Sequence, residues 1–513
     1  MKSVPKAINK WKRDVIGEES GEGSMSEQIV IFGASQGAVK VAQTLKNIGL
    51  DFDFFVDNDK WKIGTTKEGK QIRSPEVLSD KESDYKIIIA SMYHDEIKEQ
   101  LLGMGVCPDN IVMKERYLLD YINHYKLRDF AQKSKTRINS GGNSFIIDLC
   151  EGMVLGGIEK WGLNLANALS VKGNKVTIIT KDEEAEVEFD HNISVIKFDL
   201  SYQRYMESVI ELADQLIAEL PAVIMINRIN QLFMASYMIK KLYPEHIRII
   251  SVIHSDFSRM YEQNQFVCDN IDQFLCVSEE IKNRLVTDYK IDEAKVYYKD
   301  SPVFYDKEFI KQYTGKNASL KIGYGGRLER AQKRSDLLIP LIIELETLGV
   351  DYHMKIAGNG YYYDKIYDFI EVKKLQEKIE LTGFLTEEEM RALWKESDIF
   401  INLSEIEGSC LSMLEAMSYG AVPIVTNTSG AKRFIRHNEN GYIEPIGDVK
   451  AIANRIAYLD KDRDLLTLFG SCLRELIKDS CRMEDYLQYL DNMIDAVEGR
   501  NANACCYCNH AGI

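Results

Sequence analysis

Short apolar runs alternate with longer helical stretches along most of this chain, in two successive series. The runs have the length and β-branched content of buried strands, as in Ile247–Ile253 of the first series and Val422–Thr426 of the second. Strands that alternate with helices in this way form parallel sheets with helices on both faces. The sequence therefore predicts an α/β protein whose two doubly wound, Rossmann-like lobes face a cleft.

A smaller α/β unit precedes the two series. Gln28–Phe32 has the pattern of a buried strand, and the GASQGA stretch after it turns into a helix. This stretch lacks the middle glycine of the dinucleotide-binding pattern G-x-G-x-x-G. Two interpretations stay open. Either Gly33, Gly37 and Asp57 form a second nucleotide site with Asp57 on the ribose, or the glycines serve only a tight turn and close helix packing.

These patterns divide the chain into segments. We expect a flexible arm at residues 1–26, an additional N-terminal Rossmann-like module at 27–115, a connecting helix and linker at 116–142, an N-terminal lobe on the acceptor side at 143–315, a C-terminal lobe on the donor side at 316–497, and a tail at 498–513. Basic residues in the arm could touch an anionic membrane, although a solvated arm is the simpler interpretation. The tail contains ACCYCNH, which we interpret as free thiols at a frayed end, with a metal site as the alternative.

Composition limits where the protein works and what it binds. The net charge of −15 argues against a nucleic-acid surface, because phosphate backbones need a basic face. No apolar run approaches the ~18–20 residues that span a bilayer, and the first residues lack the apolar core of a secretory signal. The ten cysteines are scattered, which fits reduced thiols. We therefore expect a cytoplasmic protein, with peripheral contact at the inner face of the plasma membrane left open.

The stretch SEIEGSCLSMLEAM carries three glutamates, and two of them, Glu407 and Glu415, lie eight residues apart across a predicted strand-to-helix junction. Glu407 lies in the loop at the carboxyl end of a strand, where doubly wound sheets bind ligands. The backbone N–H groups that open the helix would attract phosphate; they belong to Gly408, Ser409, Cys410 and Leu411. Glu415 lies about two turns into the helix, where its carboxylate could accept hydrogen bonds from a sugar diol. The alternative is that Glu407 only begins a helix and that Glu415 forms a surface salt bridge.

A basic cluster in an otherwise acidic chain, GGRLERAQKRSD, is the second candidate element. Two glycines end a predicted strand, and Arg327 and Lys333 follow. Arginine suits bidentate contacts with phosphate, and lysine supplies a compact charge. Cations at the start of a helix oppose its dipole, so an anion would justify them. We therefore favour a diphosphate site over a solvated basic helix start.

Both elements, together with GGIEKWGLNLANALSVKGNKVTII, VIHSD, FLCVSEEI, IAGNG and LTGFL, resemble the retaining glycosyltransferases of family 4, which have the GT-B fold. The resemblance covers roughly residues 144–495. It implies that Arg327 and Lys333 contact a donor diphosphate, that Glu407 approaches the transferred sugar, and that Glu415 holds the ribose. It also implies that the backbone near Phe384 contacts the donor base and that Gly156 and Gly157 lie close to the phosphates or the acceptor. His254 would approach the donor sugar.

The resemblance further implies transfer of a hexose from a UDP- or GDP-sugar to an acceptor hydroxyl, with retention at the anomeric carbon. The acceptor would be a polysaccharide, a lipid-linked sugar or a protein glycan in bacterial cell-surface polysaccharide or glycoconjugate synthesis. An Asp-x-Asp metal motif is not needed if Arg327 and Lys333 take the place of Mg²⁺, and a metal-ligand cluster is not visible in either lobe, so we expect no metal and no cofactor. A catalytically degenerate nucleotide-sugar sensor and a GT-B sugar-nucleotide epimerase are the alternatives. The sequence leaves the oligomeric state open.

Residues 27–115 resemble the N-terminal Rossmann-like domain of bacterial sugar acetyltransferases, which helps bind a nucleotide sugar. The resemblance rests on IVIFGASQG, FFVDND and KIIIAS, and no acetyltransferase repeat follows. The chain also departs from the family 4 pattern at three places. Arg334 follows Lys333 where the family often has a glycine, KDSP at residues 299–302 replaces an Asn-Gly, and Arg433 stands where a glutamate is expected.

Overall fold

The computed structural model describes residues 28–79, 85–91, 93–133, 144–149, 156–181, 190–198 and 202–508, with side chains up to residue 496. The predicted arm and the side chains of the Cys-rich tail lie outside the described residues. Internal contacts group the chain into two compact units. The first combines the chain before residue 155, which includes the N-terminal module, with residues 173–251 and 258–272, and the second combines residues 155–172 and 252–257 with the chain from Gln273 onward.

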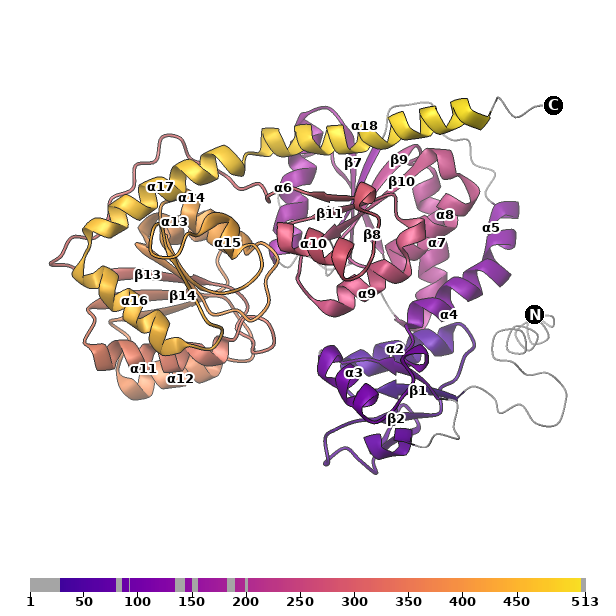
Figure 1. The fold of residues 1–513 in the computed structure, drawn as a ribbon, viewed down its shortest axis with the longest axis horizontal. Coiled ribbons are helices and arrows are strands. Elements are labelled where there is room, and N and C mark those ends of the chain that lie inside the picture. Colours follow the sequence, from indigo (N-terminus) through magenta and orange to yellow (C-terminus); the bar gives the residue numbers. More distant parts are fainter. Residues whose placement is uncertain are drawn as a thin grey trace. The chain divides into compact units, whose positions relative to one another are not determined.

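The N-terminal module, drawn in indigo in Figure 1, has a five-stranded sheet in the order β3-β4-β2-β1-β5. Its strands are β1 (Gln28–Phe32), β2 (Phe54–Val56), β3 (Thr66–Lys67), β4 (Lys70–Arg73) and β5 (Tyr85–Ile89). All pairs are parallel except the β3–β4 hairpin. The helices of this part are α2 (Gln36–Asn47), α3 (His94–Gly103), α4 (Lys114–Tyr121) and α5 (Leu127–Lys133). This is the Rossmann-like arrangement that the alternating pattern predicts.

A seven-stranded sheet follows, in the order β12-β11-β10-β9-β6-β7-β8. Its strands are β6 (Ser144–Asp148), β7 (Lys175–Lys181), β8 (Ser194–Phe198), β9 (Ala222–Ile226), β10 (Ile247–Ile253), β11 (Gln273–Cys276) and β12 (Val296–Tyr298). Its helices are α6 (Gly157–Val171), α7 (Tyr205–Ile217), α8 (Gln231–Leu242), α9 (Ser258–Phe266) and α10 (Glu279–Thr287). Every neighbouring pair whose register is described is parallel.

The C-terminal lobe has a six-stranded, fully parallel sheet in the order β15-β14-β13-β16-β17-β18. Its strands are β13 (Leu320–Gly325), β14 (Tyr352–Ala357), β15 (Ile379–Gly383), β16 (Ile399–Asn402), β17 (Val422–Thr426) and β18 (Tyr442–Glu444). The strand order reverses between β13 and β16, because the chain builds outward to β15 and then returns. Ligands of doubly wound sheets bind at such a reversal.

Helices cover the C-terminal sheet and continue to the end of the described chain. They are α11 (Leu338–Leu348), α12 (Tyr363–Lys373), α13 (Glu387–Glu396), α14 (Leu411–Ser418), α15 (Ala431–Phe434), α16 (Val449–Lys461), α17 (Asp464–Ser480) and α18 (Met483–Cys508). None of the helices in the described part of the chain has the length and apolar character needed to cross a bilayer.

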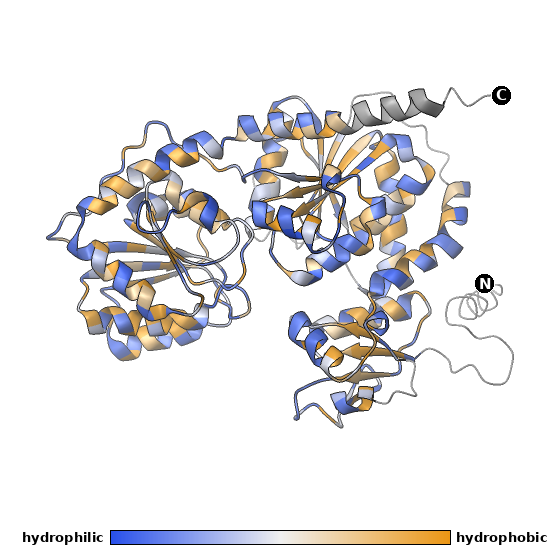
Figure 2. Ribbon diagram, viewed as in Figure 1, coloured by the Kyte–Doolittle hydropathy of each residue, from blue (hydrophilic) through white to orange (hydrophobic). Residues whose placement is uncertain are grey.

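The apolar cores lie between the sheets and their helices. Ile322 of β13 and Ile424 of β17 are fully buried in one cluster with Leu341 of α11 and Ile456 of α16. Figure 2 shows hydrophobic residues along the strands and an alternation of hydrophilic and hydrophobic residues along the helices. This is the pattern of parallel strands buried on both faces under amphipathic helices. The prediction of an α/β fold with two Rossmann-like lobes and an additional N-terminal domain is confirmed.

Candidate active site

The loops that carry the predicted site residues leave the carboxyl ends of neighbouring strands in the C-terminal lobe. Arg327 follows β13, Phe384 follows β15 and Glu407 follows β16. Because all these strands are parallel, their carboxyl ends lie along one edge of the sheet. The fold therefore brings the two candidate elements of the sequence to the same edge, at the reversal of strand order.

Backbone contacts fix these loops against one another. The Gln332 carbonyl accepts a hydrogen bond of 2.8 Å from the Glu405 N–H, which joins the basic loop to the SEIEG loop. Gly358 has φ +136°, and a Cβ on it would lie 1.9 Å from the Gly326 carbonyl oxygen. A side chain at Gly358 would therefore separate the loops that follow β13 and β14.

Glu407 and Lys333 form a buried ion pair. Lys333 Nζ donates to Glu407 Oε1 at 2.6 Å, and the side chains are 16% (Lys333) and 6% (Glu407) exposed. The same carboxylate oxygen accepts from Ser404 Oγ at 2.6 Å and from Asn402 Nδ2 at 3.2 Å. Three donors thus orient a single carboxylate at the end of β16.

Both members of this pair are charged at neutral pH. Burial by itself would raise the pKa of Glu407, but the nearby Lys333 ammonium and the hydrogen bonds from Ser404 and Asn402 hold it below its usual value. Burial also disfavours the Lys333 ammonium, yet the Glu407 carboxylate raises the pKa of Lys333 well above its usual range. A charged, oriented pair in a desolvated site interacts strongly with a polar ligand.

The start of α14 differs in detail from the prediction. The helix begins at Leu411, and Cys410 before it has φ +28°, an uncommon conformation for a residue other than glycine. Gly408 and Ser409 therefore lie in the preceding loop and not in the first turn of the helix. Ser409 Oγ is buried and, among the described residues, has no hydrogen-bond partner. Such a hydroxyl at the end of a loop is available to a ligand.

Segments of the N-terminal lobe contact this loop within the second compact unit. A Cβ on Gly408 would lie 2.1 Å from the His254 carbonyl oxygen, so glycine permits the close approach of the two backbones. The His254 ring packs edge-on against Trp161, with ring centroids 4.8 Å apart. Two residues further on, Asp256 accepts a hydrogen bond from Ser429 Oγ.

Glu415, on helix α14, forms an ion pair, as the alternative interpretation of the sequence had it, but the pair is largely buried and its partner was not predicted. Glu415 Oε1 lies 2.5 Å from Lys160 Nζ of α6, and both side chains are largely buried. Gly156 is the N-cap residue of α6, and a Cβ on Gly157 would lie 3.9 Å from the Leu411 Cβ. The sequence shows Lys160 close after the Gly156-Gly157 pair, and this could have marked it as a candidate site residue. Its partner Glu415 could not be predicted, because it is distant along the chain.

The remaining predicted contacts lie on the surface. The Arg327 side chain is 62% exposed, donates to Gln332 Oε1 at 2.8 Å and lies 3.2 Å from Glu329. Phe384 is also exposed. The basic cluster does not begin a helix, since α11 starts at Leu338 after a short 3-10 turn. Lys333 is therefore the buried cation of this loop, and Arg327 stands at its rim.

In the N-terminal module, the residues of the candidate second nucleotide site are held by the chain's own groups. A Cβ on Gly33 would lie 3.0 Å from the Ala90 carbonyl oxygen, and one on Gly37 would lie 3.3 Å from it. The Asp57 carboxylate accepts from the Ala34 N–H at 2.8 Å and pairs with Lys62 at 3.1 Å. These contacts match the structural interpretation of the GASQGA turn.

Two of the three departures from the family 4 pattern, Arg433 and the KDSP segment, pair with each other. Arg433 lies 3.0 Å from the Asp300 carboxylate, which is nearly buried and also accepts a hydrogen bond from the Tyr298 hydroxyl. The Arg433 guanidinium and the Asp300 carboxylate thus compensate each other's charge. Within the described residues, there is no group of three or more His, Cys, Asp and Glu side chains that could hold a metal ion.

Comparison with known families gives three matches in tandem. Residues 155–298 match the family Glycosyltransferase Family 4, and residues 306–471 match Glycosyl transferases group 1. Together these matches support a GT4-type glycosyltransferase. Residues 25–112 match a third family, described as C2185-like, N-terminal.

This GT4-type chain is similar to bacterial enzymes of glycan and glycoside synthesis. It is 24% identical over 287 residues to N-acetyl-alpha-D-glucosaminyl L-malate synthase of Bacillus anthracis, a match that covers 52% of this chain and 73% of the relative. It is 31% identical over 167 residues to the poly(ribitol-phosphate) alpha-N-acetylglucosaminyltransferase of Staphylococcus aureus. That match covers 32% of this chain and 33% of the relative.

Solved structures share the fold of the two glycosyltransferase lobes. A point mutant of S. aureus TarM, in complex with fondaparinux, alpha-GlcNAc-glycerol and UDP, superimposes with a TM-score of 0.58 at 14% identity. The match covers 69% of this chain and 99% of the TarM chain. The predicted GT-B fold is confirmed by this likeness.

Proposed function

We propose that this protein is a retaining glycosyltransferase that moves a hexose from a UDP- or GDP-sugar to an acceptor hydroxyl in bacterial cell-surface glycan synthesis. The observation that carries the proposal is the buried pair of Glu407 and Lys333 at the reversal of strand order in the C-terminal sheet. A doubly wound sheet binds its ligand there. The relatives named above, which transfer or attach N-acetylglucosamine according to their names, support the same class of reaction.

The leaving group sets the electrostatic demand of such a reaction. When the anomeric carbon loses the diphosphate, negative charge grows on the phosphate oxygens and oxocarbenium character grows on the sugar. The ammonium of Lys333, the hydroxyl of Ser409 and the guanidinium of Arg327 would stabilise the departing diphosphate. Glu407, already ionised, would accept hydrogen bonds from hydroxyls of the transferred sugar.

Retention at the anomeric carbon fits a front-face route in this proposal. The acceptor hydroxyl attacks on the side from which the diphosphate leaves, and a departing phosphate oxygen takes the hydroxyl proton. The C–O bond to the diphosphate breaks as the C–O bond to the acceptor forms, so the proton and the charge both end on the nucleoside diphosphate. The protein then needs to supply positioning and charge stabilisation, and no side-chain nucleophile.

In this proposal, binding of the donor would also break the Lys160–Glu415 ion pair. A ribose that takes the oxygens of Glu415 would displace the Lys160 ammonium, which is then free to face the adjacent diphosphate. We propose that the acceptor is a polysaccharide, a lipid-linked sugar or a protein glycan, and that the reaction takes place on the cytoplasmic side.

The test is turnover of a panel of UDP- and GDP-sugars, measured as release of the nucleoside diphosphate. We expect at least one donor to be hydrolysed slowly, and Glu407→Gln and Lys333→Met each to lose at least about a hundredfold of that rate. Glu405→Gln is the matched control, since Glu405 lies in the same loop and pairs on the surface with Arg334. NMR of the product then shows whether the new linkage has the anomeric configuration of the donor.

Two other results of the same assay would favour a different function. Binding of a nucleotide sugar without any turnover favours a sensor. Interconversion of two sugar nucleotides with no acceptor favours an epimerase. Full activity in both Glu407→Gln and Lys333→Met would remove the assignment of the site.

A further inference from the structure

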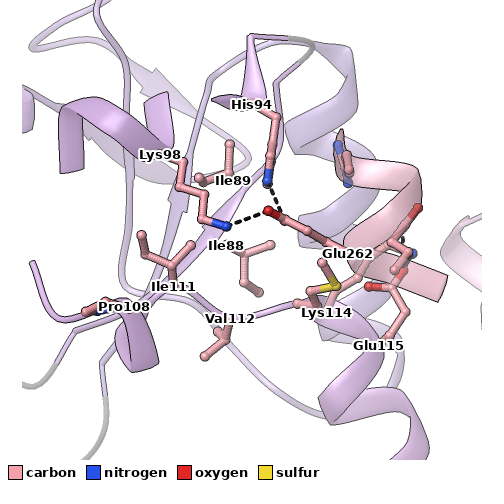
Figure 3. Close-up of a pocket in the computed structure, with 13 residues that line it drawn as sticks. Ile88, Ile89, His94, Lys98, Pro108, Ile111, Val112, Lys114, Glu115 and Glu262 are labelled. Atoms are coloured by element: carbon pink, nitrogen blue, oxygen red, sulfur yellow. Dashed lines mark hydrogen bonds and ion pairs between the residues drawn. The ribbon is translucent and has the colours of Figure 1, made fainter. Parts of the chain in front are cut away.

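A pocket in the first compact unit lies between the N-terminal module and helix α9 of the N-terminal lobe (Figure 3). Part of its lining is apolar and comes from β5 and the segment after α3, with Ile88, Pro108 and Ile111 among the side chains. The rest is polar or charged. Figure 3 shows the Glu262 side chain of α9 reaching toward His94 and Lys98 of α3.

Most of the charges in this pocket compensate one another. Glu262 lies 2.8 Å from His94 Nε2 and 2.5 Å from Lys98 Nζ. Burial would raise the pKa of Glu262, but these two partners outweigh burial and lower it. Lys114 and Glu115 form a second pair at 3.2 Å.

Arg259 of α9 is the exception among the charged lining residues. No group in the described part of the chain forms a hydrogen bond or an ion pair with its guanidinium. With Glu262 and Glu115 already matched by lysines, the pocket has one positive charge in excess when His94 is neutral. In a chain with a net charge of −15, an unmatched guanidinium beside an apolar lining is a distinct local feature.

His94 presents a second unmatched group. The residue is only 5% exposed, and its Nδ1 has no hydrogen-bond partner in the described part of the chain. A buried polar atom without a partner is uncommon and calls for a ligand or a water. In the neutral tautomer whose Nε2 donates to Glu262, Nδ1 is an acceptor. A ligand hydroxyl would satisfy it.

We propose that this pocket binds a small hydroxy carboxylic acid with an apolar body. The carboxylate pairs with Arg259 in the bidentate geometry that a guanidinium favours. The hydroxyl donates to His94 Nδ1, and the apolar part lies against Ile88 and Ile111. A monoanion suits the site better than a phosphate dianion, because the excess charge of the pocket is a single positive one. The proposal does not depend on glycosyl transfer, since none of these residues belongs to the candidate active site.

The chain itself connects this pocket to the candidate active site. Helix α9 begins at Ser258, whose hydroxyl donates to Asp95 of the module at 2.6 Å. Asp256, which bonds Ser429 and Arg284, stands two residues earlier. Helix α9 therefore follows directly in sequence on the segment that contains Asp256.

Calorimetric titration of the full chain with three matched probes tests the proposal. Mandelate has the carboxylate, the hydroxyl and an apolar ring; phenylacetate lacks the hydroxyl; 1-phenylethanol lacks the charge. We expect mandelate to bind with one site per chain, phenylacetate to bind several-fold more weakly, and 1-phenylethanol not to bind. Saturating UDP is present throughout, so that any donor site is occupied and a failure of the proposed function leaves this test unaffected.

Arg259→Met should weaken mandelate binding at least about tenfold, because a charge-assisted contact is lost. Arg436→Met, which alters an exposed arginine of the C-terminal lobe, is the control and should leave the affinity unchanged. Circular dichroism of both variants verifies that they are folded. The proposal is overturned if mandelate fails to bind at concentrations up to about 10 mM, or if its affinity is the same in Arg259→Met as in the wild type.

Discussion

The buried pair of Lys333 and Glu407 makes a quantitative prediction for Glu407→Gln. Glutamine keeps the size of the side chain and can still accept from Ser404 and Asn402, but it removes the charge that compensates Lys333. At the observed 2.6 Å, two unit charges attract each other by ~6 kcal/mol with an effective dielectric constant of about 20. Desolvation offsets part of this attraction, and leaving one charge of a buried pair unmatched costs about 3–5 kcal/mol. We expect a loss of roughly 3 kcal/mol, at the low end because the other hydrogen bonds survive.

Urea unfolding followed by circular dichroism and tryptophan fluorescence measures this loss. Trp394 lies in the core of the C-terminal lobe, packed on Phe400, and reports on that lobe. Lys333→Met and the double variant complete a mutant cycle, in which we expect a coupling free energy of about 2 kcal/mol. The control Glu405→Gln alters an exposed residue and should stay within about 0.5 kcal/mol of the wild type.

The pH dependence of this stabilisation follows from the signs of the two pKa shifts. The folded state depresses the pKa of Glu407, so its contribution is present above the unfolded value of about 4.3 and is lost as pH falls through the folded pKa. The folded state raises the pKa of Lys333, so that contribution is present below about 10.4 and is lost as pH rises through the folded pKa. The cycle should therefore give the same coupling at every pH between about 5 and 10. A coupling near zero at pH 7 would refute the reasoning, because the two side chains would then be independent.

Two further predictions concern the loop around this pair. Gly408→Ala should reduce donor turnover at least about tenfold, because the added Cβ would displace the His254 backbone. The control Gly315→Ala should leave turnover unchanged, because no atom lies within 4 Å of its added Cβ. Equal turnover rates in the two variants would show that the loops of Gly408 and His254 need not touch. Burial and, after it, the Glu407 carboxylate raise the pKa of Cys410 to about 11. Iodoacetamide at about pH 8 should therefore alkylate the exposed Cys472 of the native protein and spare Cys410, as read by peptide mass spectrometry; rapid labelling of Cys410 would mean that the loop opens.

Most strands that the sequence pattern does not predict in the two lobes lie at the edges of the sheets. The periodicity predicts the central strands of each sheet, such as β10 and β17, because both of their faces are buried and their apolar runs are continuous. Of the edge strands of the N- and C-terminal lobes, it predicts β15 but not β8, β12 or β18. An edge strand has one neighbour, so its residues are partly exposed and its pattern is mixed. Register with a neighbour, and not composition, makes such a segment a strand.

Local sequence determined that Glu407 would stand in a loop at the end of a strand and that Lys333 would follow a glycine turn after another strand, because strand and glycine-turn signals are short-range, although it placed Lys333 at the start of a helix that begins only at Leu338. It also determined the fold class, through the order of strands and helices. Only the tertiary structure decided which charges pair. Lys333 joins Glu407, Lys160 joins Glu415 and Arg433 joins Asp300, each across a long stretch of sequence. A side chain's partner depends on which strand ends are neighbours in the sheet, and that is a property of topology that no local pattern contains.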